Sequence, residues 1–296
     1  MKNFTNLFLA ACMITGFAFT VNAQSVGINA DGSAPNSSAG LDVNFTNKGF
    51  LPPRMNTTQR NSISSPVEGL VIYNTDEKTL NIYNGNSWDS IIPFFCGQSF
   101  KDLRDGKVYT TVQIGTQCWM AQNLNIGNKI DGSGEQTNNS PTPIIEKYCN
   151  DNNESNCDIY GGLYQWDEMM QYSTTSGVQG ICPTGWHVPT DAEWATLITF
   201  LGGESVAGGK MKETGTTHWN GYNTGATNSS GFTALPGGYR ATSGLYYITG
   251  WNCNLWSSTQ NSTTDAWNRI LNENSAYVYR DWHTKGFGFS VRCVRD

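Results

Sequence analysis

Side chains that could perform acid–base or nucleophilic chemistry are few in this sequence. Histidine, the usual general base near neutral pH, occurs three times, at His187, His218 and His283. No G-x-S-x-G, H-E-x-x-H or P-loop motif is present, which argues against serine hydrolysis, zinc proteolysis and nucleotide binding. We expect the His187 ring to bond to backbone just before a helix. His218 and His283 each neighbour a tryptophan, and we expect them to pack within loops, with ligand stacking as the alternative.

The carboxylates also lack a catalytic arrangement. A glycosidase needs two carboxyl groups roughly 5–9.5 Å apart across a cleft. Asp167 and Glu168 are adjacent, so on a helix they would point in different directions. The run 151–156 has alternating oxygen ligands like a calcium loop, but it lacks the glycine at the sixth position and the glutamate at the twelfth. We therefore expect a solvated loop there, no catalytic residue, no metal and no cofactor.

The cysteines predict disulfides rather than zinc or redox chemistry. Of the eight, Cys12 lies in the leader and the other seven all follow residue 95. None has C-x-x-C spacing, and an exported chain meets an oxidising compartment. Seven cysteines allow three bridges and one free thiol. Cys149 and Cys157 would close a short Asn-rich loop and are the simplest local pair, while spacing leaves the other pairings open.

A contact surface is the strongest functional feature of the sequence. Aromatic and amide side chains are concentrated over 246–283. Tyr and Trp give contact area at little entropic cost, and Asn gives adaptable hydrogen bonds. Strand alternation must bury one side, so we expect Trp256 and one face of 266–271 in the core. The predicted ligand-binding residues are Tyr246, Tyr247, Trp251, Asn252, Asn254, Trp267, Arg269, Asn272, Tyr277, Tyr279, Arg280, Trp282 and His283.

Residues 1–23 predict a secretory signal peptide. A cationic start precedes an apolar run from about Leu7 to Val21, and we expect cleavage after Ala23. A membrane anchor would need roughly 20 apolar residues. Lipidation would require cleavage before Cys12, yet the apolar run continues past it. We expect the protein to be secreted or held at the cell surface, with no membrane span.

Length and composition set the domain organisation. The chain has 296 residues, a net charge of −6 and only 14% charged residues, against a typical value of about 25%. An acidic chain of this kind has no footprint for nucleic acid or anionic membrane. The length fits two folded units behind a leader, a Cys-free β-rich module over 24–92 and a main domain over 96–296.

The module over 24–92 should contain two β runs, at 69–76 and 79–85, and one or two helical turns at 57–63. It is too small for a large core, so we expect it to be stabilised in a homo-oligomer or against the next domain.

The main domain should be α+β, with little helix and long loops. We expect a hairpin with an Asp-Gly turn over 104–115, a weak helix over 164–171 and a terminal strand over 288–294. The clearest helix starts after Thr190, because Glu193 completes a capping box. Its apolar stripe is Trp194, Leu197, Ile198 and Leu201.

Two family resemblances follow from these motifs. The stretches GFLPPRM, SPVEGLVIYNTD and LNIYNGNSW resemble a short module of exported proteins of Bacteroidetes-type bacteria, similar to parts of phage tail fibres and adhesin stalks. The stretches YTTVQIGTQCWMAQNLN, YGGLYQWDEMMQY, GICPTGWHVPTDAEW, GFTALPGGYR and GFSVRCVRD resemble the Fibrobacter succinogenes major paralogous domain. The first resemblance implies a presenting or assembly segment.

The second resemblance implies a C-type-lectin-like fold, with small antiparallel sheets, one or two helices and long loops. It also implies a bridge between Cys182 and Cys293, which leaves Cys96–Cys118 as the third pair and Cys253 as the odd thiol. The E-P-N, Q-P-D and W-N-D signatures of calcium-dependent sugar binders are absent, and the reactive cysteine pair of formylglycine-generating enzymes is missing.

The sequence therefore predicts a non-enzymatic binding protein, exported or on the cell surface, that presents a C-type-lectin-like domain to an extracellular glycan or protein. Two alternatives stay open at this point. The aromatic surface could be an assembly interface of a structural subunit in an appendage or matrix, or the protein could be an enzyme acting on polysaccharide.

Overall fold

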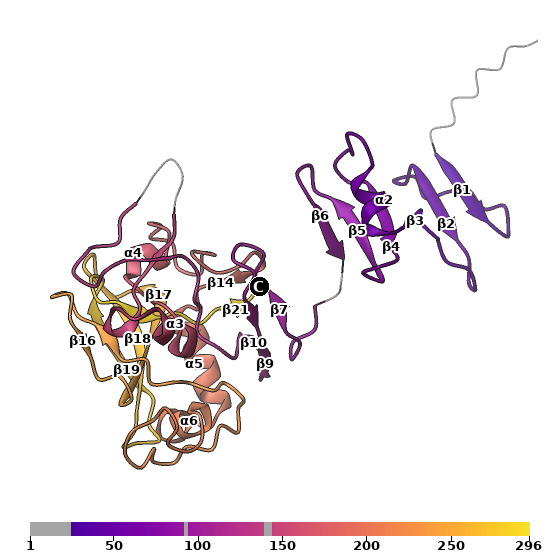
Figure 1. Ribbon diagram of the computed structural model, residues 1–296. Helices are drawn as coiled ribbons and strands as arrows, with labels where there is room; N and C mark the ends of the chain where they lie inside the picture. The colour runs from indigo at the N-terminus through magenta and orange to yellow at the C-terminus, as the bar shows by residue number, and fades with distance from the viewer. Residues whose placement is uncertain (1–24, 92–93, 139–143) are drawn as a thin grey trace, which may run out of the picture. The chain divides into compact units, whose positions relative to one another are not determined.

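A computed structural model of the chain describes residues 25–91, 94–138 and 144–296 (Figure 1). The predicted signal peptide lies outside the described residues. The chain divides into two compact units, Met1–Pro93 and Phe94–Asp296, and each is described by itself. Within the described ranges, every helix is too short or too polar to cross a membrane.

The N-terminal unit contains a four-stranded sheet and a separate two-stranded ribbon. The sheet has the order β3-β4-β5-β6, formed by Arg54–Met55, Val71–Asn74, Thr79–Tyr83 and Trp88–Ile91. The two predicted β runs are the antiparallel pair β4–β5. The predicted helical turn is α2, Thr57–Asn61, and Asn56 caps it with a capping box to Gln59.

The ribbon pairs β1, Val26–Asn29, with β2, Leu41–Asn44, in parallel. Val26, Ile28 and Leu41 are exposed. Parallel strands normally have both faces covered, and an isolated pair of strands is marginally stable in water. These apolar side chains of the ribbon are not buried by any described residue of the same chain.

The C-terminal unit is built on a five-stranded sheet with the order β13-β20-β17-β18-β19. Figure 1 labels three of these strands, β17, β18 and β19. The strands are β13 Leu163–Tyr164, β17 Asn252–Gln260, β18 Asp265–Asn272, β19 Tyr279–Thr284 and β20 Phe289–Ser290. The antiparallel hairpin β17–β18 continues into β19, which forms an edge of the sheet. Much of the predicted contact region therefore lies on one three-stranded meander.

A second sheet, β14-β21-β10-β9, joins the beginning of this unit to its end. Its strands are β9 Thr111–Ile114, β10 Gln117–Met120, β14 Trp186–His187 and β21 Val294–Arg295. The predicted terminal strand over 288–294 is split, because the chain passes from the first sheet at β20 to the second sheet at β21.

Three two-stranded pieces complete the strands. They are β7 Phe100–Lys101 with β8 Val108–Tyr109, β11 Asn128–Lys129 with β12 Glu146–Lys147, and β15 Tyr239–Arg240 with β16 Tyr246–Tyr247. The Asp-Gly turn connects β7 and β8, so the hairpin starts earlier than the predicted range of 104–115.

The helices of this unit are α3 Glu154–Tyr160, α4 Trp166–Met169, α5 Asp191–Phe200 and α6 Glu204–Met211, with a 3-10 turn η1 at Asn150–Asn152. The predicted capping box of α5 is confirmed: Thr190 Oγ1 accepts from Glu193 N at 3.1 Å, and Glu193 Oε2 accepts from Thr190 N at 2.8 Å. Its predicted apolar stripe is buried. The predicted weak helix is α4. The described part of the unit thus has four α-helices where the resemblance implied one or two.

Tryptophan dominates the core of this unit. Six indole side chains are almost completely buried: Trp119, Trp166, Trp186, Trp194, Trp219 and Trp256. Buried indole N–H groups need an acceptor. Trp166 donates to Ser257 O at 2.8 Å and Trp256 donates to Tyr164 O at 2.9 Å. These bonds tie the five-stranded sheet to the segment around α4, and the predicted burial of Trp256 is confirmed.

All three expected disulfides are present. Cys149–Cys157, Cys182–Cys293 and Cys96–Cys118 are bonded. Cys253 is free and buried, and burial raises the pKa of its thiol to about 12, which keeps it protonated and unreactive.

Buried cations hold the long loops in place. Loops inside a protein must satisfy their backbone carbonyls. The Lys212 ammonium is buried and donates to Thr224 O, Asn272 O and Ser275 O at 2.9–3.0 Å. Arg240 donates in the same way to the carbonyls of Gly132, Gly134 and Gly286.

His187 contacts the C-terminal residue Asp296. The prediction that its ring bonds to backbone was wrong. Its ring does not bond to backbone: Nε2 lies 2.8 Å from Glu193 Oε1, and Nδ1 lies 2.6 Å from Asp296 Oδ1. The capping glutamate is within reach because β14 leads directly into α5. Hydrogen bonds from the ring to the carboxylates of Glu193 and then Asp296 raise the pKa of His187, although burial opposes them.

Candidate functional site

The predicted contact residues differ widely in exposure. Trp282 is 50% exposed, Trp251 44%, Tyr247 43% and Tyr279 41%, and Arg280 is also exposed. Six others are partly buried: Tyr246, Asn252, Trp267, Asn272, Tyr277 and His283. Asn254 and Arg269, at 2% and 1%, lie in the interior and offer no atoms to a ligand at the surface. The prediction that these two contact a ligand is corrected on that ground.

A tryptophan–arginine group, Trp267, Arg280 and Trp282, lies at the edge of the five-stranded sheet. Trp267 of β18 is directly opposite Trp282 of β19, so both point to the same face. The Arg280 guanidinium lies 3.3 Å from the centre of the Trp267 ring. An aromatic pair with a stacked cation suits the flat face of a sugar ring or an aromatic side chain.

Asp191, the first residue of α5, holds the Arg280 side chain of this group through an ion pair. Its carboxylate lies 3.0 Å from Arg280 Nη2 and 2.8 Å from Arg269 Nη1. The two arginines together lower the pKa of Asp191 against the opposing effect of burial. Arg269 lies on the same face of the sheet as Trp267, and it is buried because α5 covers this part of the face, where Arg269 pairs with the Asp191 carboxylate.

The side chains on the other face of β19 do not belong to the tryptophan–arginine group. Tyr279 and His283 alternate with Trp282, so they point away from the tryptophan–arginine group. The His283 ring packs on Phe287 and Phe289, and its Nδ1 lies 2.8 Å from Asn268 Nδ2. Burial lowers its pKa. His283 therefore packs against other rings as predicted, but it does so from strand β19 and not from a loop.

The remaining predicted residues lie on loops beside the sheet. The Tyr246 hydroxyl donates to Asn152 Oδ1 at 2.8 Å, which links β16 to η1. Trp251 precedes β17 and its backbone carbonyl accepts from Glu273 N at 3.0 Å. The Tyr277 and Tyr279 rings lie 4.8 Å apart, and Tyr277 bonds to Glu204 of α6. The structure thus divides the predicted residues among several places.

Asp167 and Glu168 are neighbours on α4, where Asp167 is exposed and Glu168 is buried. Both line one pocket together with Glu135. Glu168 Oε1 accepts from Glu146 N at 2.8 Å and Oε2 from the Tyr172 hydroxyl at 2.8 Å. Burial raises the pKa of Glu168. The described residues also contain no group of three or more His, Cys, Asp or Glu side chains that could hold a metal ion.

A pocket of about 340 Å³ lies elsewhere on the C-terminal unit. We call it the α3 pocket, since Cys157, Asp158, Ile159 and Tyr160 form one wall. The other walls are residues 107–109, 121–123 and 125, Thr233, Leu235 and Arg292. None of the residues between Tyr246 and His283 lines it.

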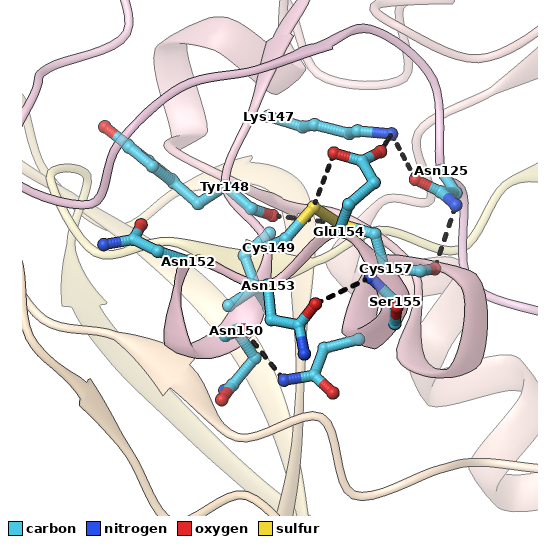
Figure 2. Close-up of a disulfide and its surroundings, with 12 residues drawn as sticks. Asn125, Lys147, Tyr148, Cys149, Asn150, Asn152, Asn153, Glu154, Ser155 and Cys157 are labelled. Carbon is cyan, nitrogen blue, oxygen red and sulfur yellow. Dashed lines mark hydrogen bonds and ion pairs between the residues drawn. A yellow bond between two sulfur atoms is a disulfide. The ribbon is translucent and has the colours of Figure 1, made fainter.

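A disulfide and an ion pair hold the α3 wall (Figure 2). Cys157 of α3 is bonded to Cys149, and Lys147 Nζ lies 3.1 Å from Glu154 Oε1 at the start of the helix. Asn125 accepts from Lys147 Nζ at 2.7 Å and donates to Cys157 O at 2.9 Å. The run 151–156, predicted to be a solvated loop, is largely exposed, but it forms the end of η1 and the start of α3.

The comparisons with known proteins bear on both units. Residues 112–295 match the family model of the Fibrobacter succinogenes major domain, which is more than half of the chain. The chain belongs to this family. Residues 27–105 are similar to a phage tail like trimerisation region. The chain matches no curated protein and no solved structure.

The Fibrobacter succinogenes major domain here includes both sheets, from β9 to β21, and the four helices. The tryptophan–arginine group and most of the α3 pocket lie inside it. Reasoning from the sequence missed the pocket, because its walls come from separate segments of the chain. The one available signal was the short disulfide loop, which the sequence did predict.

Proposed function

We propose that this protein is exported and acts as a non-enzymatic binding protein. Its C-terminal unit would be a C-type-lectin-like domain that binds an extracellular glycan or protein. Its N-terminal unit would join copies of the chain, so that several domains are presented together.

The exposed tryptophans carry this proposal. Among the tryptophans of the C-terminal unit, six are almost completely buried, whereas Trp251 and Trp282 are 44% and 50% exposed. Trp282 lies beside the stacked Arg280, and a large apolar side chain left at the surface in such a place is typical of the centre of a binding surface. The disulfides support an oxidising compartment, which agrees with export. The bridge from Cys182 to the end of the chain, together with long loops, supports the lectin-like assignment.

The exposed apolar ribbon supports oligomerisation through the N-terminal unit. Val26, Ile28 and Leu41 need cover that the described residues of one chain do not provide. The similarity of residues 27–105 to a trimerisation region suggests three copies as the source of that cover.

Glycan and protein arrays with matched variants test the binding proposal. We expect Trp282→Ala and Trp251→Ala to weaken binding at least about tenfold, the loss typical of a central aromatic contact. Phe200→Ala is the control, because Phe200 is an exposed aromatic on α5 outside the predicted region. We expect EDTA to leave binding unchanged. The proposal fails if no glycan or protein binds, or if all three variants bind like the wild type.

A structural subunit is the second candidate, and the free edge of β19 favours it. Unpaired edge strands can pair with another chain. Light scattering of the mature protein distinguishes the two. A closed trimer that Ile28→Asp converts to monomer agrees with a presenting stalk, whereas open-ended growth that persists in Ile28→Asp agrees with a structural subunit. A strict monomer at high concentration contradicts both forms of assembly.

A further inference from the structure

We propose that the α3 pocket is a second ligand site, which takes one neutral, hydroxyl-rich ring such as a pyranose unit. The pocket has a volume of about 340 Å³, which lies within the usual range of small-molecule sites. The inference goes beyond the proposed function, because it concerns a separate place on the molecule and does not need the tryptophan–arginine group to bind anything.

Polar groups with unused hydrogen-bonding capacity converge on this pocket. Lys107 Nζ donates to Asn125 O at 2.8 Å and also interacts with the Lys147 side chain, which leaves one N–H bond for a ligand. The Gln122 side-chain oxygen is occupied by Thr110, so its amide nitrogen is left to donate. Within the described residues, no hydrogen bond involves the Asp158 carboxylate or the Tyr160 hydroxyl. The pocket therefore offers both donors and acceptors.

The distribution of charge argues for a neutral ligand. An anion at Lys107 would also face the Asp158 carboxylate, and a cation at Asp158 would face the Lys107 ammonium. Arg292 provides no second anchor for a carboxylate. Its five N–H donors are all used, by Asn123 and the carbonyls of Met120, Phe232 and Thr233.

The shape and rigidity of the pocket suit a ring. Side chains of Tyr160, Ile159 and Leu235 supply apolar surface for the faces of a ring, while its hydroxyls can both donate and accept at the polar rim. The wall is preorganised, because Asn123 Nδ2 donates to Tyr160 O at 2.8 Å and the disulfide of Figure 2 ties the same helix. Gly161 ends the helix with φ +84°, and a Cβ there would lie 2.6 Å from the Asn123 side chain.

Ligand-observed NMR and calorimetry on the full mature chain test this site. The probes are methyl glycosides of glucose, galactose, mannose and N-acetylglucosamine, with alanine as a zwitterion and inorganic phosphate as an anion. We expect at least one glycoside to bind with a dissociation constant below about 10 mM. Asp158→Asn should weaken it at least fivefold, because the replacement removes a charged acceptor while keeping the shape. Tyr160→Phe should weaken it severalfold.

Controls separate this site from the surface on β18 and β19. Trp282→Ala should leave glycoside binding in the α3 pocket unchanged, whereas it should weaken array binding. Since Asp158 is exposed and Tyr160→Phe removes one hydroxyl, both variants should melt like the wild type. The inference is overturned if no glycoside binds, if binding is indifferent to Asp158→Asn and Tyr160→Phe, or if only alanine or phosphate binds. Each of these outcomes leaves the proposed function standing.

Discussion

Removing the Cys182–Cys293 bridge should destabilise the C-terminal unit more than removing Cys149–Cys157. The two bridges span 111 and 8 residues of sequence. A cross-link restricts the unfolded chain, and the restriction grows with the logarithm of the loop it closes. From these lengths the loop-entropy relation gives about 4.8 kcal/mol for the long loop and about 2.5 kcal/mol for the short one at 25 °C.

Urea unfolding of the two double variants checks the difference. Cys182→Ala/Cys293→Ala and Cys149→Ala/Cys157→Ala each remove two buried sulfurs, so losses of packing largely cancel in the comparison. We expect the free energy of unfolding to fall by about 2 kcal/mol more in the first variant than in the second. Equal losses, or a larger loss for the short bridge, would refute the reasoning that unfolded-state restriction is the main contribution.

Two further predictions concern buried charge. Lys212→Met should lower the free energy of unfolding by about 3 kcal/mol, since it removes a buried charged group that donates three hydrogen bonds to backbone carbonyls. Urea unfolding measures this, and a loss no larger than that of the exposed Lys129→Met would contradict it. His187 has a raised pKa in the folded protein, so its contribution to stability is complete below its ordinary value of 6.5 and is lost as pH rises through the folded value. The partner Glu193 has a lowered pKa, so its contribution is present above 4.5 and is lost as pH falls. Melting temperatures across pH should therefore decline above about 6.5 in the wild type, and His187→Gln should flatten that decline; an identical slope in the variant would show that His187 does not cause it.

Local signals predicted elements of this fold, and tertiary contacts decided the rest. The capping box of Thr190 and the apolar stripe that follows it predict α5 correctly, because the residues that form these signals are close together in the sequence. By contrast, α6 contains adjacent glycines that disfavour a helix. Glycine is needed there because the helix lies close to another backbone segment: a Cβ on Gly208 would lie 2.6 Å from Tyr277 O. A contact of this kind cannot be predicted from the local sequence.

The candidate sites divide in the same way. The concentration of aromatics over 246–283 was visible in the sequence, and Trp256 is buried as predicted. The strand 266–271 was predicted to bury one face, but it buries Ala266 and Asn268 on one face and Arg269 and Leu271 on the other. The sequence did not show that Arg269 would be buried, since its partner Asp191 comes from a helix far away in the chain. The α3 pocket could not be predicted, because its lining residues, among them Lys107, Gln122 and Asp158, come from separate segments of the chain.

The Cys96–Cys118 bridge also has a mechanical consequence. Tension applied through the N-terminal unit enters the C-terminal unit at Phe94 and soon reaches Cys96. The bridge passes this force covalently to β10, so the weak hairpin β7–β8 is shielded from it. Strand β10 lies between β9 and β21, and Cys293 beside β21 is bonded onward to Cys182. Tension on the C-terminal unit through its N-terminus would therefore be distributed over the two middle strands of this sheet, and the unit would stay folded under forces that peel an unbridged hairpin.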